Sequence, residues 1–101
     1  MTLSSSRKKE LRAIGHKLNP VVIVSENGLS EGVLAELERA LEDHELIKVK
    51  FALPERDDRK ELIDAMIKET RAELAQTIGK IALIFRPAKK PNPKLSNLTR
   101  I

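Results

Sequence analysis

The chain has 101 residues, of which 41% are apolar and 34% are charged, and its net charge is +4. This length and composition indicate one folded domain with a single modest core. The sequence contains no cysteine, which excludes disulfides and thiolate metal sites. No apolar run approaches the roughly 20 residues that span a bilayer, and the start (MTLSSSRKKE) lacks the apolar core of a signal peptide. We therefore expect a cytoplasmic protein that does not enter a membrane.

The charged residues are segregated along the chain. Residues 1–19 carry five basic side chains and one acidic, residues 20–73 carry eight and fourteen, and residues 74–101 carry six and none. Both ends are therefore basic and the middle is acidic. This polarity favours an anionic partner, and the alternative is that the charges only solvate the surface of an α/β domain.

Residues 4–15 are predicted to form the first helix. Leu11, Ile14 and Leu18 recur at helical spacing, and a serine before them supplies the cap. Segment 16–20 ends the helix because it leads into a proline. Four side chains, which we call the basic flank, lie together beside the apolar stripe: Lys8, Lys9, Arg12 and His16.

Residues 21–24 (VVIV) are apolar and β-branched, which predicts a strand buried on both faces inside a parallel sheet. Residues 25–29 form a turn marked by an Asn-Gly pair. Ser30 caps a second helix, in which apolar residues from Val33 to Leu41 share one arc. The outer face of that helix carries three carboxylates: Glu31, Glu38 and Glu42.

Residues 45–52 (ELIKVKFA) alternate between apolar and polar side chains. The apolar ones face one way, and Lys48 and Lys50 face the other, which predicts a strand with one dry and one wet face. We therefore expect helices to cover only one side of the sheet along this strand.

A third helix is predicted to be capped by Asp57 or Asp58 and to end near Arg71. Residues 73–78 and 81–86 are two further strands. The Gly-Lys pair between them is the two-residue Gly-X connection of a type II′ hairpin.

The remaining segment, residues 88–101, is rich in proline and lysine and has no acidic residue. We expect it to be a disordered basic tail after a domain at residues 1–87. The element order is α-β-α-β-α-β-β. Each β-α-β step predicts a right-handed crossover between parallel neighbours, and the hairpin adds an antiparallel strand. The predicted fold is a small α/β open sandwich around a mixed four-stranded sheet.

Catalysis finds little support in this sequence. It has two histidines, His16 and His44, and neither a P-loop nor a G-x-G-x-x-G motif. We interpret His44 as a packing residue at a helix end and Ser30 as a cap with no base nearby. We therefore expect a monomer that is not an enzyme and takes no cofactor, metal or small-molecule substrate.

Binding to a nucleic-acid backbone is better supported. The two aromatic residues, Phe51 and Phe85, are expected to be buried, which leaves no platform on which bases stack. Basic side chains are suited to contact phosphates instead. The corner formed by residues 24–31 is suited as well, because Gly28 permits a close approach and a helix N-terminus favours anions.

Several stretches of the sequence are distinctive: HKLNPVVIVSENG (16–28), LSEGV (29–33), ALEDHELIKVK (40–50), QTIGK (76–80) and IFRP (84–87). Together they resemble the chloroplast RNA splicing and ribosome maturation (CRM) domain, whose stand-alone bacterial members are YhbY-like proteins. The likeness covers residues 3–87. It implies a fold similar to the C-terminal domain of translation initiation factor three. It also implies RNA binding and association, through ribosomal RNA, with precursors of the large ribosomal subunit.

The G-x-x-G loop of this family corresponds to residues 25–28. This chain departs from the pattern, since Ser25 replaces the first glycine and Glu26 lies inside the loop. A carboxylate aimed at phosphates weakens their binding. Asn27 and Gly28 are therefore the stronger candidates in this loop.

Two further positions depart from the family pattern. Arg71 stands where relatives often have a glycine at the end of the third helix. A left-handed backbone at Arg71 would cost about 1 kcal/mol. Thr77 stands where relatives usually have an apolar residue, so we expect looser packing of the last hairpin.

Two surfaces are candidates for the RNA-binding site. One combines the first helix with the corner, and the other is the wet sheet face; for each, a merely solvated surface is the alternative. Arg86 and the tail lysines would add nonspecific affinity. The candidate RNA-binding residues are Lys8, Lys9, Arg12, His16, Lys17, Ser25, Asn27, Gly28, Lys48, Lys50 and Arg86.

The leading hypothesis is a non-enzymatic RNA-binding factor in assembly of the large ribosomal subunit. The alternative is a protein-binding adaptor that uses the acidic face of the second helix. A general duplex-DNA binder is a third possibility, which the lack of a basic recognition helix disfavours.

Overall fold

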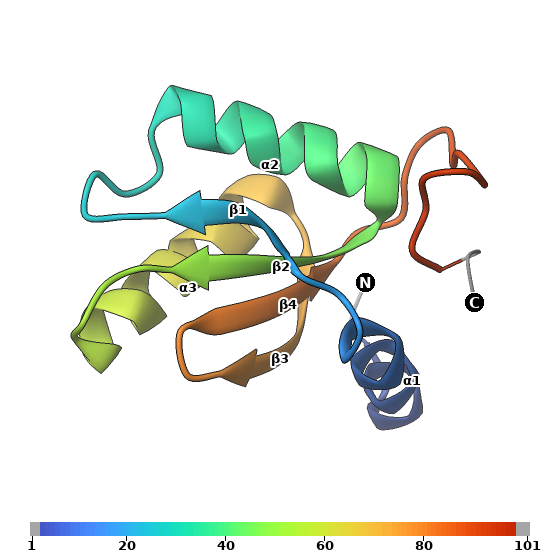
Figure 1. The fold of residues 1–101 in the computed structure, drawn as a ribbon, viewed down its shortest axis with the longest axis horizontal. Coiled ribbons are helices and arrows are strands. Elements are labelled where there is room, and N and C mark those ends of the chain that lie inside the picture. Colours follow the sequence, from blue (N-terminus) through green and yellow to red (C-terminus); the bar gives the residue numbers. More distant parts are fainter. Residues whose placement is uncertain (1–2, 99–101) are drawn as a thin grey trace.

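A computed structural model describes residues 3–98 of the chain. Within that range the chain forms three helices and one four-stranded sheet (Figure 1). The predicted α/β class and element order are confirmed. In chain order the elements are α1 (Ser5–Gly15), β1 (Pro20–Val24), α2 (Glu31–His44), β2 (Leu46–Phe51), α3 (Arg56–Thr70), β3 (Glu73–Ile78) and β4 (Ile81–Phe85).

Side-chain caps explain where two of the helices begin. Ser4 and Ser30 cap α1 and α2 as predicted, and each accepts a hydrogen bond from the backbone N–H three residues later, at 3.1 and 3.2 Å. The predicted start of α3 is wrong, because this helix begins at Arg56 after a residue whose side chain makes no cap bond. Asp57 and Asp58 lie in its first turn instead, where their charges favour the helix through its dipole.

The strand order in the sheet is β1-β2-β4-β3. β1 and β2 are parallel, as predicted, and β4 is antiparallel to both β2 and β3. The expectation that α3 links two neighbouring parallel strands is wrong, because β4 lies between β2 and β3. β4 (IALIF) takes the inner position because it is wholly apolar and four of its five residues are buried. β3 (ELAQTI) carries polar side chains and forms the edge.

The main core lies on one face of the sheet, under α2 and α3 (Figure 1). Leu37 and Leu41 of α2 and Met66 of α3 are fully buried there, together with Val49 and Phe51 of β2. Burial of each such side chain contributes about 1.5–3 kcal/mol. The alternation in residues 45–52 therefore predicted the dry face of β2 correctly.

α1 covers one end of the opposite face of the sheet. Its Leu11 is fully buried in a second cluster that includes Leu83 and Phe85 of β4. Gly15 permits this close packing, because a β-carbon there would lie 2.7 Å from Leu83. The expectation that helices cover only one side of the sheet is wrong at this end. It is right at the other end, where Lys50 is exposed.

β1 is an edge strand. Val22 and Val24 are buried under α2, whereas Val21 is 50% exposed and Ile23 is 61% exposed. The prediction of a strand buried on both faces inside the sheet is therefore wrong. The apolar run does not reveal this, because α1 packs on other strands and leaves the outer face of β1 open.

Residues 88–98 pack against the end of α2 and differ from the disordered tail that their composition predicts. The Glu45 carboxylate accepts hydrogen bonds from the Ala88 N–H and the Ser96 hydroxyl, both at 2.8 Å. Ser96 is fully buried. Residues 99–101, which also belong to the predicted tail, lie outside the described residues.

Two further contacts hold this C-terminal segment in place. The His44 imidazole makes a hydrogen bond of 2.8 Å with the carbonyl oxygen of Leu95, in agreement with its interpretation as a packing residue. The Asn97 side-chain amide donates to the Leu46 carbonyl at 2.6 Å. The prediction of a disordered tail rested on the proline and lysine content of the segment alone. That content carries no information about the hydrogen-bond acceptors at the end of α2.

The end of α3 allows a test of backbone strain. Arg71 has a φ of 59°, the left-handed conformation expected from its glycine-like position. Arg71→Gly should raise the free energy of unfolding by about 1 kcal/mol, because glycine adopts this conformation without strain. Urea denaturation measures the change. The control is Arg71→Ala, which removes the side chain and keeps the strain; equal stability of the two variants would contradict this explanation.

The packing of the C-terminal segment is testable at Ser96. Ser96→Ala should lower the free energy of unfolding by about 1–3 kcal/mol, because a buried acceptor of Glu45 loses its donor. It should also accelerate cleavage within residues 88–98 under limited trypsin digestion. Ser6→Ala, at an exposed position of α1, is the control. A digestion rate equal to that of the unmodified protein would show that this hydrogen bond does not hold the segment.

Candidate nucleic-acid interface

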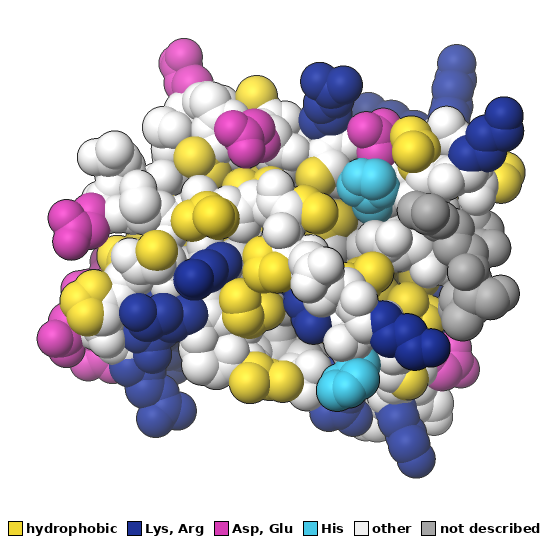
Figure 2. All heavy atoms as spheres, in the orientation of Figure 1, with side chains coloured by type: hydrophobic (Ala, Val, Ile, Leu, Met, Phe, Trp, Pro, Cys, Tyr) yellow, Lys and Arg dark blue, Asp and Glu magenta, His cyan; other side chains and the backbone are white. Residues whose placement is uncertain are grey.

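The sheet surface that α1 leaves uncovered carries both apolar and basic side chains. We call this surface the open face, and Figure 2 shows it from the front. The strand register aligns one row of it across the four strands: Ile23, Lys50, Ile81 and Ile78. The neighbouring row consists of Lys48, Leu83 and Gln76, and it forms the border with α1, because Leu83 is buried against Gly15.

Both lysines of β2 belong to the open face, as the alternation predicted. Lys50 is exposed, and Lys48 is half-buried at a shallow hollow of about 130 Å³ that Gln76 also lines. Phe51 and Phe85 are 0% and 5% exposed. The prediction that both phenylalanines are buried is therefore confirmed, and neither ring is exposed for stacking on a base.

The basic flank lies on α1, at one end of the open face. Lys9, Arg12 and His16 are exposed and Lys8 is half-buried; Lys17, just after the helix, is exposed as well. No carboxylate within residues 3–98 pairs with any of the lysines or with Arg12. Their positive charges thus remain available to an anion from solution.

Arg7, by contrast, has partners within the chain. Its guanidinium pairs with Glu10 at 2.9 Å and lies 5.5 Å from the centre of the Phe85 ring. These contacts fix the side chain over the second cluster of the core. Arg7 is therefore part of the packing of α1 and adds little to the basic flank.

The corner after β1 lies at the opposite end of that strand from α1 (Figure 1). A strand rises about 3.3 Å per residue, and the five residues of β1 separate the two groups. The expectation that the basic flank and the corner form one adjoining surface is therefore wrong. The open face lies between them, so Lys48 and Lys50 are located between the basic flank and the corner.

Carboxylates surround the corner on its α3 side. Gly28 has a φ of 70°, and a β-carbon there would lie 3.7 Å from Leu62 of α3. Glu26 lines a hollow of about 540 Å³ together with Asp58 and Glu61. Three like charges at this position oppose a phosphate. The two other corner candidates are exposed: Ser25 and Asn27.

Arg86 is engaged within the chain. Its guanidinium pairs with the Glu38 carboxylate and donates to the Thr70 carbonyl at 3.0 Å, and its side chain is only 21% exposed. Glu42 accepts a hydrogen bond of 2.9 Å from the backbone N–H of Lys89. Two of the three carboxylates on the outer face of α2 thus have intramolecular partners, which weakens the case for an adaptor surface there. The third, Glu31, is exposed.

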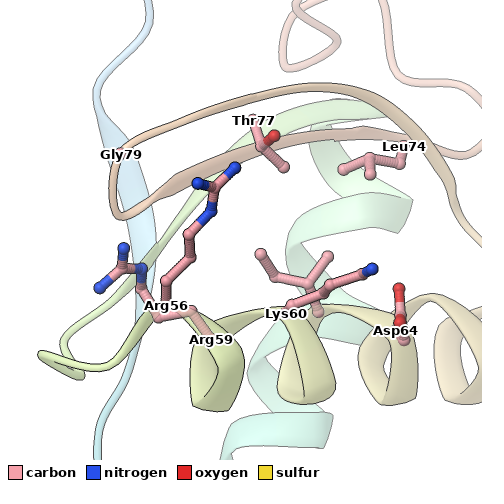
Figure 3. Close-up of a pocket in the computed structure, with 8 residues that line it drawn as sticks. Arg56, Arg59, Lys60, Asp64, Leu74, Thr77 and Gly79 are labelled. Carbon is pink, nitrogen blue, oxygen red and sulfur yellow. The ribbon is translucent and has the colours of Figure 1, made fainter.

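Sequence reasoning missed a cationic group at the start of α3. Arg56, Arg59 and Lys60 line a hollow of about 560 Å³ between α3 and the β3–β4 hairpin (Figure 3). Acidic residues lie among them in the sequence, so the net charge of the segment is close to zero. A count of charges therefore does not reveal the group. Their spacing of three and four residues was the available signal, since it places them on one side of a helix.

Among residues 3–98, no group of three histidine or carboxylate side chains is arranged to hold a metal ion. In the same range, no helix combines the length and the apolar composition that a membrane crossing requires.

The helices, the mixed sheet and the open face define a small α/β domain, and along one side it carries cations that have no salt-bridge partner within residues 3–98. The chain belongs to the CRS1/YhbY (CRM) domain family, whose model matches residues 3–86. The resemblance drawn from the sequence is therefore confirmed.

Individual relatives are similar over almost their whole length. A probable RNA-binding protein of Pseudomonas aeruginosa is 60% identical over 100 residues, which cover 99% of this chain and 96% of that protein. An RNA-binding protein of Haemophilus influenzae is 48% identical over 94 residues, 93% of this chain and 95% of that one. The solution structure of a hypothetical protein from Staphylococcus aureus matches with a TM-score of 0.77 and 34% identity, over 88% of this chain and 93% of that chain.

Proposed function

We propose that this protein binds RNA through the phosphate backbone and acts as a non-catalytic factor in assembly of the large ribosomal subunit. The observation that carries the proposal is a group of cations with no salt-bridge partner among residues 3–98, which extends from the basic flank on α1 to Lys50 on the open face. The names of its relatives, as RNA-binding proteins, support RNA as the partner. In this proposal the protein is a cytoplasmic monomer, and ribosomal RNA in precursor particles is its ligand.

The open face favours contacts with phosphates over contacts with bases. Its lysines supply charges that displace counterions from the RNA backbone. Its exposed apolar side chains, Ile23 and Ile78, are aliphatic and offer sugars and base edges a surface without π-stacking. We therefore expect affinity that depends strongly on salt and only weakly on sequence.

Sedimentation of a lysate tests the assembly role. At low salt, the protein should travel through a sucrose gradient with precursors of the large subunit, and nuclease digestion should shift it to the top. Recovery only at the top before digestion would contradict the assembly role. A complex that survives complete digestion of the RNA would favour the protein-binding adaptor instead.

The contribution of α1 is testable through the salt dependence of binding. Lys8→Glu combined with Arg12→Glu should lower the affinity for RNA. It should also flatten the plot of log affinity against log salt, by about 0.7–0.9 for each lost phosphate contact. Fluorescence anisotropy with a labelled RNA measures both quantities.

The matched control is Arg39→Glu combined with Lys68→Glu. It makes the same change in net charge at exposed positions of α2 and α3. An equal slope for the α1 variant and the unmodified protein would remove α1 from the binding surface.

A further inference from the structure

We propose that the hollow between α3 and the β3–β4 hairpin is a second phosphate-binding site for RNA; this inference rests on the proposed function. The hollow has a volume of about 560 Å³. Arg56, Arg59 and Lys60 supply three positive charges to its lining, and Asp64 supplies one negative charge. A phosphodiester of an RNA chain is the ligand that this charge and size suit.

Apart from Asp64, the charged side chains that line the two hollows beside α3 are separated by sign. The basic residues line the same hollow as Ile63, between α3 and the hairpin (Figure 3). Asp58 and Glu61 line the separate hollow beside Glu26, on the other side of the helix. An anion approaching α3 is therefore attracted from the hairpin side and repelled from the corner side.

One of the three cations is held in position by the protein. The Arg59 Nη1 donates to the carbonyls of Leu53 and Pro54, at 2.8 and 3.0 Å. A guanidinium carries five donors on three nitrogens, so this anchoring leaves two nitrogens to face a ligand. The ordering of the side chain thus precedes binding, which lowers the entropy that binding costs.

The hairpin contributes neutral groups to the opposite wall. Thr77 lies across from the arginines (Figure 3), and its hydroxyl is a donor for a phosphate oxygen. Gly79 has a φ of 54°, and a β-carbon on it would meet nothing within 4 Å, so the turn is open to a ligand. The polar residue at position 77, which departs from the family pattern, therefore has a role in this site.

The hollow is connected to the open face around the hairpin turn. The Phe51 N–H donates to the Lys80 carbonyl at 2.7 Å, which holds the turn beside the end of β2. Lys50 and Lys80 are both exposed there. Figure 2 shows lysine and arginine side chains gathered at the lower left of the open face, at the hairpin end of the sheet. An RNA chain that lies on the open face can thus continue around the hairpin into the hollow.

The test compares two variants with the same change in charge. Arg56→Gln with Lys60→Gln neutralises the hollow and leaves the anchored Arg59 in place. Arg39→Gln with Lys68→Gln neutralises two exposed cations outside it. Binding of a single-stranded RNA oligonucleotide of mixed sequence is measured by anisotropy as a function of salt. Amide spectra of the ¹⁵N-labelled proteins verify folding and report shifts at Thr77 and Gly79.

We expect the hollow variant to bind RNA about tenfold more weakly than the control. Its salt slope should fall by about 0.7 per lost contact, and RNA should shift the Thr77 and Gly79 amides of the unmodified protein. If the unmodified protein binds RNA while the two variants bind equally and these amides stay in place, the site is refuted and the proposed function stands. If the unmodified protein binds no RNA, the proposed function is refuted, and the proposal of an RNA phosphate site in the hollow is refuted with it.

Discussion

The packing of Gly15 against Leu83 determines which part of the sheet remains free for function. With no β-carbon at this position, the backbone of α1 reaches the sheet and buries Leu11 against β4. α1 therefore covers the end of the sheet where the side chains are apolar, reaches the row of Leu83 and Lys48, and stops before the row that contains Lys50. A helix over the Lys50 row would bury its ammonium group, at a cost of several kcal/mol. The open face follows from this limit on burial.

Attraction for an anion arises in this protein from the arrangement of charge and not from its total. Residues 1–86 contain fifteen basic and fifteen acidic side chains, so this part of the chain is neutral. The fold places the basic flank and the lysines of β2 on one side and the carboxylates of α2 on another. α3 repeats the separation on a smaller scale, with Arg56 and Arg59 toward the hairpin, and Asp58 and Glu61 toward the corner.

The C-terminal segment is integrated into the same distribution of charge. Glu42 and Glu45 at the end of α2 accept hydrogen bonds from its backbone. Arg86, which precedes it, pairs with Glu38. The acidic face of α2 therefore serves in part to bind the protein's own chain, which explains why an excess of basic residues at this end does not produce a free tail over residues 88–98.

The sequence by itself determined the local elements and the family. Alternation over residues 45–52, the serine before α2 and the glycine of the hairpin turn each depend on neighbours only a few residues away, where the periods of strand and helix apply. Only the tertiary structure decided that β1 is an edge and that β4 enters between β2 and β3. It also separated the corner from the basic flank and brought Arg56 and Lys60 opposite the hairpin. Each of these depends on contacts between residues far apart in the chain, which local periodicity does not encode.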